Sequence, residues 1–208
     1  MMTRQTTIHL TALLALNSMV IALVGQEKFE ITLRHNDQKE LQTREQLQRL
    51  VAAHDLSKWV FTRKLAIDSD RSVIPHSHPV LTLSVRHLKD DELLLSTFVN
   101  EQLHWFLTQN EEKTEAVVKE LLALFPKVPF GSLEGGDSEE STYHHLIVNW
   151  LEYQADRELM GELKARQVIE FWCTDHYTWI YRTVLEQDRK IGRLLYQNRL
   201  EPGLPAQK

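Results

Sequence analysis

The chain has 208 residues, of which 42% are apolar, and its 24 Lys and Arg against 29 Asp and Glu give a formal net charge of −5. These values suit one globular domain, exclude a disordered chain, and argue against a phosphate backbone as partner, so we expect no nucleic acid. The single cysteine, Cys173, excludes an intramolecular disulfide and a CxxC zinc site, so any metal must depend on His, Asp and Glu.

The N-terminus has the pattern of a targeting segment. Residues 1–25 carry one charge, Arg4, and an apolar run over residues 8–24, after which the chain becomes polar. A secretory signal peptide is expected from this pattern, with a single domain over residues 26–200 and a secreted or periplasmic location. An uncleaved membrane anchor through the apolar run, or a buried first helix, are the alternatives. A frayed tail is expected over residues 201–208.

The rest of the chain predicts a mainly helical α+β fold with a small sheet. Alternating or β-branched segments predict strands over residues 29–33, 58–67 and 80–85, the last with the pattern of an exposed or edge strand. A helix is expected to follow this edge strand over residues 91–109. The other helices are expected over residues 40–54, 113–124, 143–160 and 164–196, the last with a break near Thr174.

One helix carries a degenerate metal-binding motif. Residues 100–104, Asn-Glu-Gln-Leu-His, have the layout of HExxH with Asn100 in place of the first histidine. In HExxH two histidines four positions apart bind zinc from one helix face, and the Glu polarises the metal-bound water. Glu101 and His104 therefore occupy the positions of the general base and the second zinc ligand.

A later helix carries polar residues at matching spacing. Capped by Ser141 or Thr142, it places His145, Asn149 and Glu152 at positions i, i+4 and i+7, so they share a face.

With these two helices the sequence resembles the zincin metallopeptidases, specifically the gluzincin layout. There a Glu on a later helix supplies the third zinc ligand, often with a small residue three positions on, and Glu152 and Ala155 match that element. Residues 58–185 also resemble an uncharacterised family whose motif helix reads HEQxHW. The resemblance implies zinc, a peptide or protein partner, and an edge strand at residues 80–85 that pairs with extended substrate.

Asn100 is the main departure from the zincin pattern. An amide oxygen is a weak zinc donor compared with imidazole, so zinc affinity is expected to be weakened or lost. Without a tightly held metal, Glu101 has no activated water to deprotonate. His145 could complete a set with His104 and Glu152, or the Pro-bracketed loop could supply His76 and His78.

We therefore expect a metallopeptidase-related, zincin-like protein with a degenerate zinc site, either a pseudoenzyme or a weak hydrolase. The alternatives are a non-catalytic exported peptide- or protein-binding domain and a helical structural protein with an accidental motif match. In an active protein, Tyr177, Tyr181 or His176 would stabilise the oxyanion. The candidate metal ligands are His104, Glu152, Asn100 and His145, and the candidate catalytic residues are Glu101, Tyr177, Tyr181 and His176.

Overall fold

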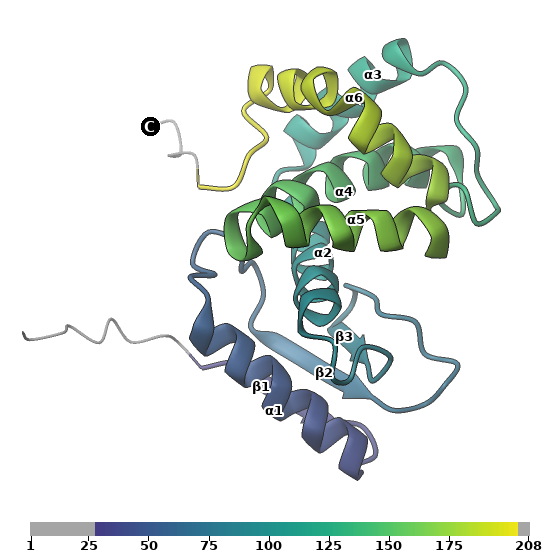
Figure 1. The fold of residues 1–208 in the computed structure, drawn as a ribbon. Coiled ribbons are helices and arrows are strands. Elements are labelled where there is room, and N and C mark those ends of the chain that lie inside the picture. The colour runs from purple at the N-terminus through teal and green to yellow at the C-terminus, as the bar shows by residue number, and fades with distance from the viewer. Residues whose placement is uncertain (1–27, 204–208) are drawn as a thin grey trace, which may run out of the picture.

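A computed structural model describes residues 28–203, which form six helices and a three-stranded parallel sheet (Figure 1). The predicted fold class, mainly helical α+β with a small sheet, is confirmed. The expected signal peptide or anchor lies outside the described residues. Among residues 28–203, no helix is both long enough and apolar enough to cross a membrane.

The sheet is built from a strand, a crossover helix and two further strands. β1 (Glu30–Leu33), β2 (Lys64–Asp68) and β3 (Leu81–Ser84) run parallel in that spatial order. The crossover from β1 to β2 is α1 (Gln38–Ala53). Asp37 caps its N-terminus, because this side chain accepts hydrogen bonds from two backbone N–H groups of the first turn. In the register, Ile31 lies opposite Leu65, and Leu65 lies opposite Leu81.

The strand predicted over residues 58–67 is only half right, because residues 58–63 form turns and loop. Trp59 is buried in a turn, so its aromatic character signals burial rather than a strand. The side chain of Gln102 then takes the place of a strand partner. Its Oε1 accepts hydrogen bonds from the N–H groups of Phe61 and Thr62, both at 2.8 Å, and its Nε2 donates to the Thr62 carbonyl at 2.9 Å.

β3 lies at the edge of the sheet, so the predicted edge strand is confirmed. All four of its residues are buried, so the alternative of an exposed strand is wrong. Its outer edge is also occupied at Thr82. The N–H of Thr82 donates to the His76 carbonyl at 2.8 Å, and the N–H of His76 donates to the Thr82 carbonyl at 3.1 Å. An extended substrate cannot pair with β3 at Thr82 while this bridge is in place; pairing along the rest of the strand stays a prediction.

The helical part surrounds one central helix (Figure 1). α4 (Glu139–Met160) contacts α2 (Asp91–Gln109), α3 (Glu111–Leu124), α5 (Glu162–Asp175) and α6 (Thr178–Gln197). In Figure 1, α2 runs between the sheet and the stacked α4 and α5. Because α4 is enclosed, its polar face must meet polar groups of its neighbours.

Two local features set the ends and packing of these helices. α4 begins after Ser138, whose side chain accepts from the N–H of Ser141 at 3.0 Å, so the predicted cap at Ser141 or Thr142 is wrong by about one turn. α6 approaches α4 closely at Gly192, where an added Cβ would lie 2.5 Å from Cζ2 of Trp150. The predicted break in the last helix is present, at residues 176–177.

Candidate functional site

The structure brings all the candidate site residues to one cavity of about 620 Å³. The cavity lies between α2, α4 and the junction of α5 with α6, and two loops form its mouth. The candidate residues that line it are Asn100, Glu101, His104, His145, Glu152, His176, Tyr177 and Tyr181.

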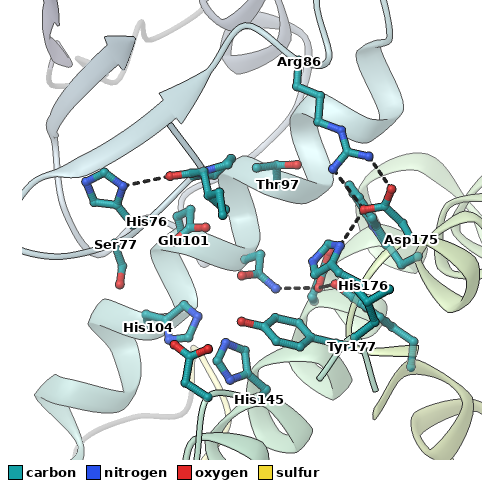
Figure 2. A pocket seen from close by; sticks show the side chains of 18 of the residues that line it. His76, Ser77, Arg86, Thr97, Glu101, His104, His145, Asp175, His176 and Tyr177 are labelled. Atoms are coloured by element: carbon teal, nitrogen blue, oxygen red, sulfur yellow. Dashed lines mark hydrogen bonds and ion pairs between the residues drawn. The ribbon is translucent and has the colours of Figure 1, made fainter. Parts of the chain in front are cut away.

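Helix α2 supplies one polar stripe of the cavity wall. Thr97, Asn100, Glu101 and His104 are three or four positions apart, so they project from one side of the helix. Figure 2 shows Thr97, Glu101 and His104 along this helix, with His145 and Tyr177 across the cavity from them. The periodicity that predicts the helix therefore also places these side chains.

The carboxylate of Glu152, only 2% exposed, is held by three hydrogen-bond donors. Ser96 Oγ donates to Oε1 at 2.5 Å, while Asn100 Nδ2 at 2.7 Å and the Tyr181 hydroxyl at 3.0 Å donate to Oε2. Burial raises the pKa of Glu152 to about 7, although the three hydrogen bonds act in the opposite direction. The amide of Asn100 therefore contacts directly the carboxylate that the zincin resemblance makes a zinc ligand.

A deeper polar cluster supports Glu152. Trp172 Nε1 donates to Ser96 Oγ at 3.1 Å, and Asp156 lies one turn beyond Glu152 on α4. Burial, together with the charge of Glu152, raises the pKa of Asp156 well above its usual value. Within the described residues, Asp156 Oδ1 and Asn149 Nδ2 are buried without a hydrogen-bond partner. Sequence reasoning missed Ser96 and Asp156, although each lies four positions from a candidate residue.

Glu101 and His104 face the cavity as neutral groups at neutral pH. Burial, and then the charge of Glu152, raise the pKa of Glu101 to about 8. Burial, with the neighbouring histidines, lowers the pKa of His104 to about 3. A carboxyl group that is protonated at neutral pH donates a hydrogen bond, so Glu101 is poorly suited to act as the general base that the motif implies.

His145 and Tyr177 form an aromatic group with His104 at one end of the cavity (Figure 2). The ring centroid of His145 lies 5.0 Å from that of His104 and 4.2 Å from that of Tyr177. His145 Nδ1 donates to the Ser141 carbonyl at 2.7 Å, which leaves Nε2 as an acceptor. Burial lowers the pKa of His145 to about 4 and raises that of Tyr177 to about 12.

The backbone at Tyr177 is left-handed, with φ of 49°, a conformation that is strained for a bulky residue. This conformation separates α5 from α6 and places the phenol ring against His145. A strained residue that lines a cavity is a common feature of functional sites.

Arg86 and Asp175 complete the upper part of the cavity in Figure 2, and sequence reasoning missed both. Both guanidinium Nη atoms of Arg86 donate to the Asp175 carboxylate, and His176 Nδ1 donates to it at 2.7 Å. Burial alone would raise the pKa of Asp175, but these hydrogen bonds hold it below its usual value. Asp175 thereby fixes the His176 ring, and the adjacent Asp-His pair was the available sequence signal.

Only one group of three His, Cys, Asp or Glu residues in the described chain has its ligand atoms within 4.8 Å of one another, and it lies elsewhere. His35, Glu40 and Asp68 are close enough to hold a metal ion. However, Glu40 accepts hydrogen bonds from the backbone N–H groups of His35, Asn36 and Ser69, and Asp68 pairs with His35 at 3.1 Å. These contacts join the loop that follows β1 to the loop that follows β2, and they explain why the three side chains lie together.

The candidate zinc ligands do not fit a zinc ion as they are placed. His104, His145 and Glu152 share a cavity but do not form a close group of the kind above. Both oxygens of Glu152 are engaged by hydrogen-bond donors. His76 lines the same cavity, but its backbone is held in the bridge to β3.

Comparison with known proteins gives no match to any family model, curated protein or solved structure.

Proposed function

We propose that the protein is a zincin-related peptide-binding protein with a degenerate zinc site, in which hydrolysis is weak or lost. The observation that carries this proposal is the 2.7 Å hydrogen bond from Asn100 Nδ2 to Glu152 Oε2. In an intact site of this layout, a metal ion would join residue 100 to Glu152. Here an amide donor joins them, and the polar groups satisfy one another without an ion.

The state of Glu101 supports the same proposal. Its carboxyl group is buried, has no hydrogen-bond partner within the described residues, and has a pKa of about 8. At neutral pH it can donate to a carbonyl oxygen of a ligand, as the hydroxyl of Tyr177 can. Donors of this kind in a cavity suit recognition of a peptide backbone, which presents a carbonyl acceptor at every residue.

The cavity mouth adds apolar contacts for a ligand. Ile74 is 78% exposed and Leu133 is 70% exposed, and the two line the cavity from different loops. Exposed apolar side chains at the mouth of a polar cavity are typical of a binding site for a chain with mixed polar and apolar groups. The partner we propose is therefore a peptide or an exposed protein segment, met in the secreted, periplasmic or membrane-anchored location predicted from residues 1–25.

The test is enrichment of peptides from a randomised acetylated hexapeptide library by the immobilised protein, read by mass spectrometry. The wild type is expected to retain peptides with apolar residues. The variant Ile74→Ser with Leu133→Ser is expected to retain at least fivefold less, since exposed apolar contacts of this size contribute about 1 kcal/mol or more. Leu163→Ser, at a site that is 74% exposed and outside the cavity lining, is the matched control. Equal retention by the wild type and the double variant would contradict the proposal.

A further inference from the structure

The two edges of the sheet differ in how they are covered. The outer edge of β3 is occupied at Thr82 by the bridge to His76. β1 forms the other edge, and within residues 28–203 it pairs only with β2. This pairing is continuous from Glu30 to Leu33, with no bulge and no proline. β1 therefore presents an open edge to which another strand can add.

The backbone hydrogen bonds of β1 show which of its groups face outward. The N–H groups of Glu30 and Arg34 donate to backbone carbonyls on the β2 side, at 2.9 Å and 3.0 Å. Because the direction of the amide groups alternates along a strand, the N–H and C=O groups of Ile31 and Leu33 point away from β2. These two residues therefore offer donors and acceptors to a further strand.

The side chains of β1 divide between the two faces of the sheet. Ile31 and Leu33 are half-buried, and Ile31 packs against the hydrophobic core. Glu30, Thr32 and Arg34 are exposed on the opposite face. In the described part of the chain, the side chains of Glu30 and Arg34 make no hydrogen bond or ion pair. The open edge thus carries two opposite charges, both unpaired.

This strand is complementary to itself when two copies run antiparallel about a two-fold axis at Thr32. Ile31 of one copy then lies opposite Leu33 of the other, and the two residues exchange both backbone hydrogen bonds. Glu30 of one copy lies opposite Arg34 of the other, in a non-hydrogen-bonded pair, where facing side chains approach most closely. The same pair forms again across the axis. Registers centred on Ile31 or on Leu33 form neither charge pair.

We propose that β1 pairs with β1 of a second copy of the chain, so that two three-stranded sheets join into one sheet of six strands. The two pairs of Glu30 with Arg34 set the register, and Ile31 and Leu33 extend the apolar face across the axis. A self-complementary patch of this kind is the usual basis of a homodimer. The pairing is short, so we expect monomer and dimer in a concentration-dependent equilibrium. The interface is independent of the proposed function, since no residue of β1 lines the cavity.

Disulfide trapping in the full chain with Cys173→Ser tests the register. Thr32→Cys places one thiol of each copy at the two-fold axis, so mild oxidation is expected to link the two copies through residue 32. Cα atoms of a non-hydrogen-bonded antiparallel pair lie about 4.5 Å apart, which suits a disulfide. Gln48→Cys, at an exposed neutral position of α1, is the matched control and is expected to link at least tenfold more slowly.

Charge reversal, followed by sedimentation equilibrium, tests the partner. Glu30→Arg puts two arginines opposite each other in both pairs, and Arg34→Glu puts two glutamates there, so each single variant is expected to dimerise about tenfold or more weakly. The double variant Glu30→Arg, Arg34→Glu restores opposite charges and is expected to dimerise as the wild type does. A mixture of the two single variants is expected to form a heterodimer, because every Arg then faces a Glu.

The outcomes are decisive for this interface. Rescue in the double variant and in the mixture would support it, since a variant that fails to fold is not rescued by a charge change on another chain. Equal linking of Thr32→Cys and Gln48→Cys, or single variants that dimerise as well as the wild type, would overturn it. A wild type that stays monomeric, with no link through residue 32, would also overturn it and leave the edge of β1 to a strand of another protein.

Discussion

Replacing Glu101 by Gln should change how the stability of the protein depends on pH. The carboxyl of Glu101 has an ordinary pKa of 4.5 and, in the folded protein, a pKa of about 8, because of burial and then the charge of Glu152. Between these values the folded state holds a proton that the unfolded state has lost. Stability from this group is therefore complete below pH 4.5 and falls as the pH rises towards 8.

The magnitude follows from the two pKa values. Their difference corresponds to a loss of at most about 5 kcal/mol of stability above pH 8, of which about 3 kcal/mol is already lost at pH 7. Gln keeps the shape and never ionises, so Glu101→Gln should be increasingly more stable than the wild type as the pH rises from 4.5 to 8. Relaxation of the cavity and entry of water make these figures upper limits.

The assay is urea unfolding of wild type and variant at intervals between pH 4.5 and pH 9. The free-energy difference between them should grow with pH and level off above pH 8. Glu112→Gln, at an exposed position of α3, is the control for loss of a surface carboxylate. A difference between wild type and Glu101→Gln that is the same at every pH would refute the reasoning, because it would mean that Glu101 ionises alike in the folded and unfolded chain.

Three other substitutions test separate contacts of the structure. Tyr181→Phe removes one donor to the buried carboxylate of Glu152 and should cost about 1–3 kcal/mol in urea unfolding; no loss would show that this hydrogen bond is not formed. Asp175→Asn should lower the pKa of His176 further, because the carboxylate opposes the lowering by burial; NMR titration that gives an unchanged or higher pKa would contradict this. Gly192→Ala should destabilise the contact of α6 with α4 by about 1–3 kcal/mol, despite the better helix propensity of Ala, and a rise in thermal stability would contradict the packing.

The sequence predicts the motif helix well because its signals are local. Asp90 caps α2, two acidic residues follow in the first turn, and the 3.6-residue period continues to Gln109, so the predicted range of residues 91–109 agrees with the structure. The same period places Asn100 and His104 on one side of the helix. The spacing of residues therefore predicts which side chains share a face of α2 and which share a face of α4. These two faces line one cavity because the two helices pack together.

The structural features that the sequence does not predict depend on contacts between residues that lie far apart in the chain. The aromatic and β-branched residues over 58–63 predict a strand. The segment forms turns instead, because the side chain of Gln102, about 40 positions away in the chain, binds its backbone. The bridge between His76 and Thr82 occupies the outer edge of β3 at one residue, which the alternation of residues does not reveal. Contacts of Arg86 with Asp175 span 89 positions and leave no periodic signal.

The central claim concerns the contact between Asn100 and Glu152, and zinc content tests it most directly. Zinc is measured by elemental analysis after incubation with zinc and desalting, in a His35→Ala background that removes the cluster near Glu40. Asn100→His places an imidazole one turn before His104 and removes the amide donor from Glu152, so this variant is expected to retain one equivalent of zinc.

The protein with Asn100 is expected to retain almost no zinc, as is Asn100→Gln, which keeps an amide without adding an imidazole. Stoichiometric zinc in the protein with Asn100 that is lost on His104→Ala would contradict the account, because the site that we propose to be degenerate would then be a working metal centre. Negligible zinc in Asn100→His would contradict the proposed zincin-related geometry.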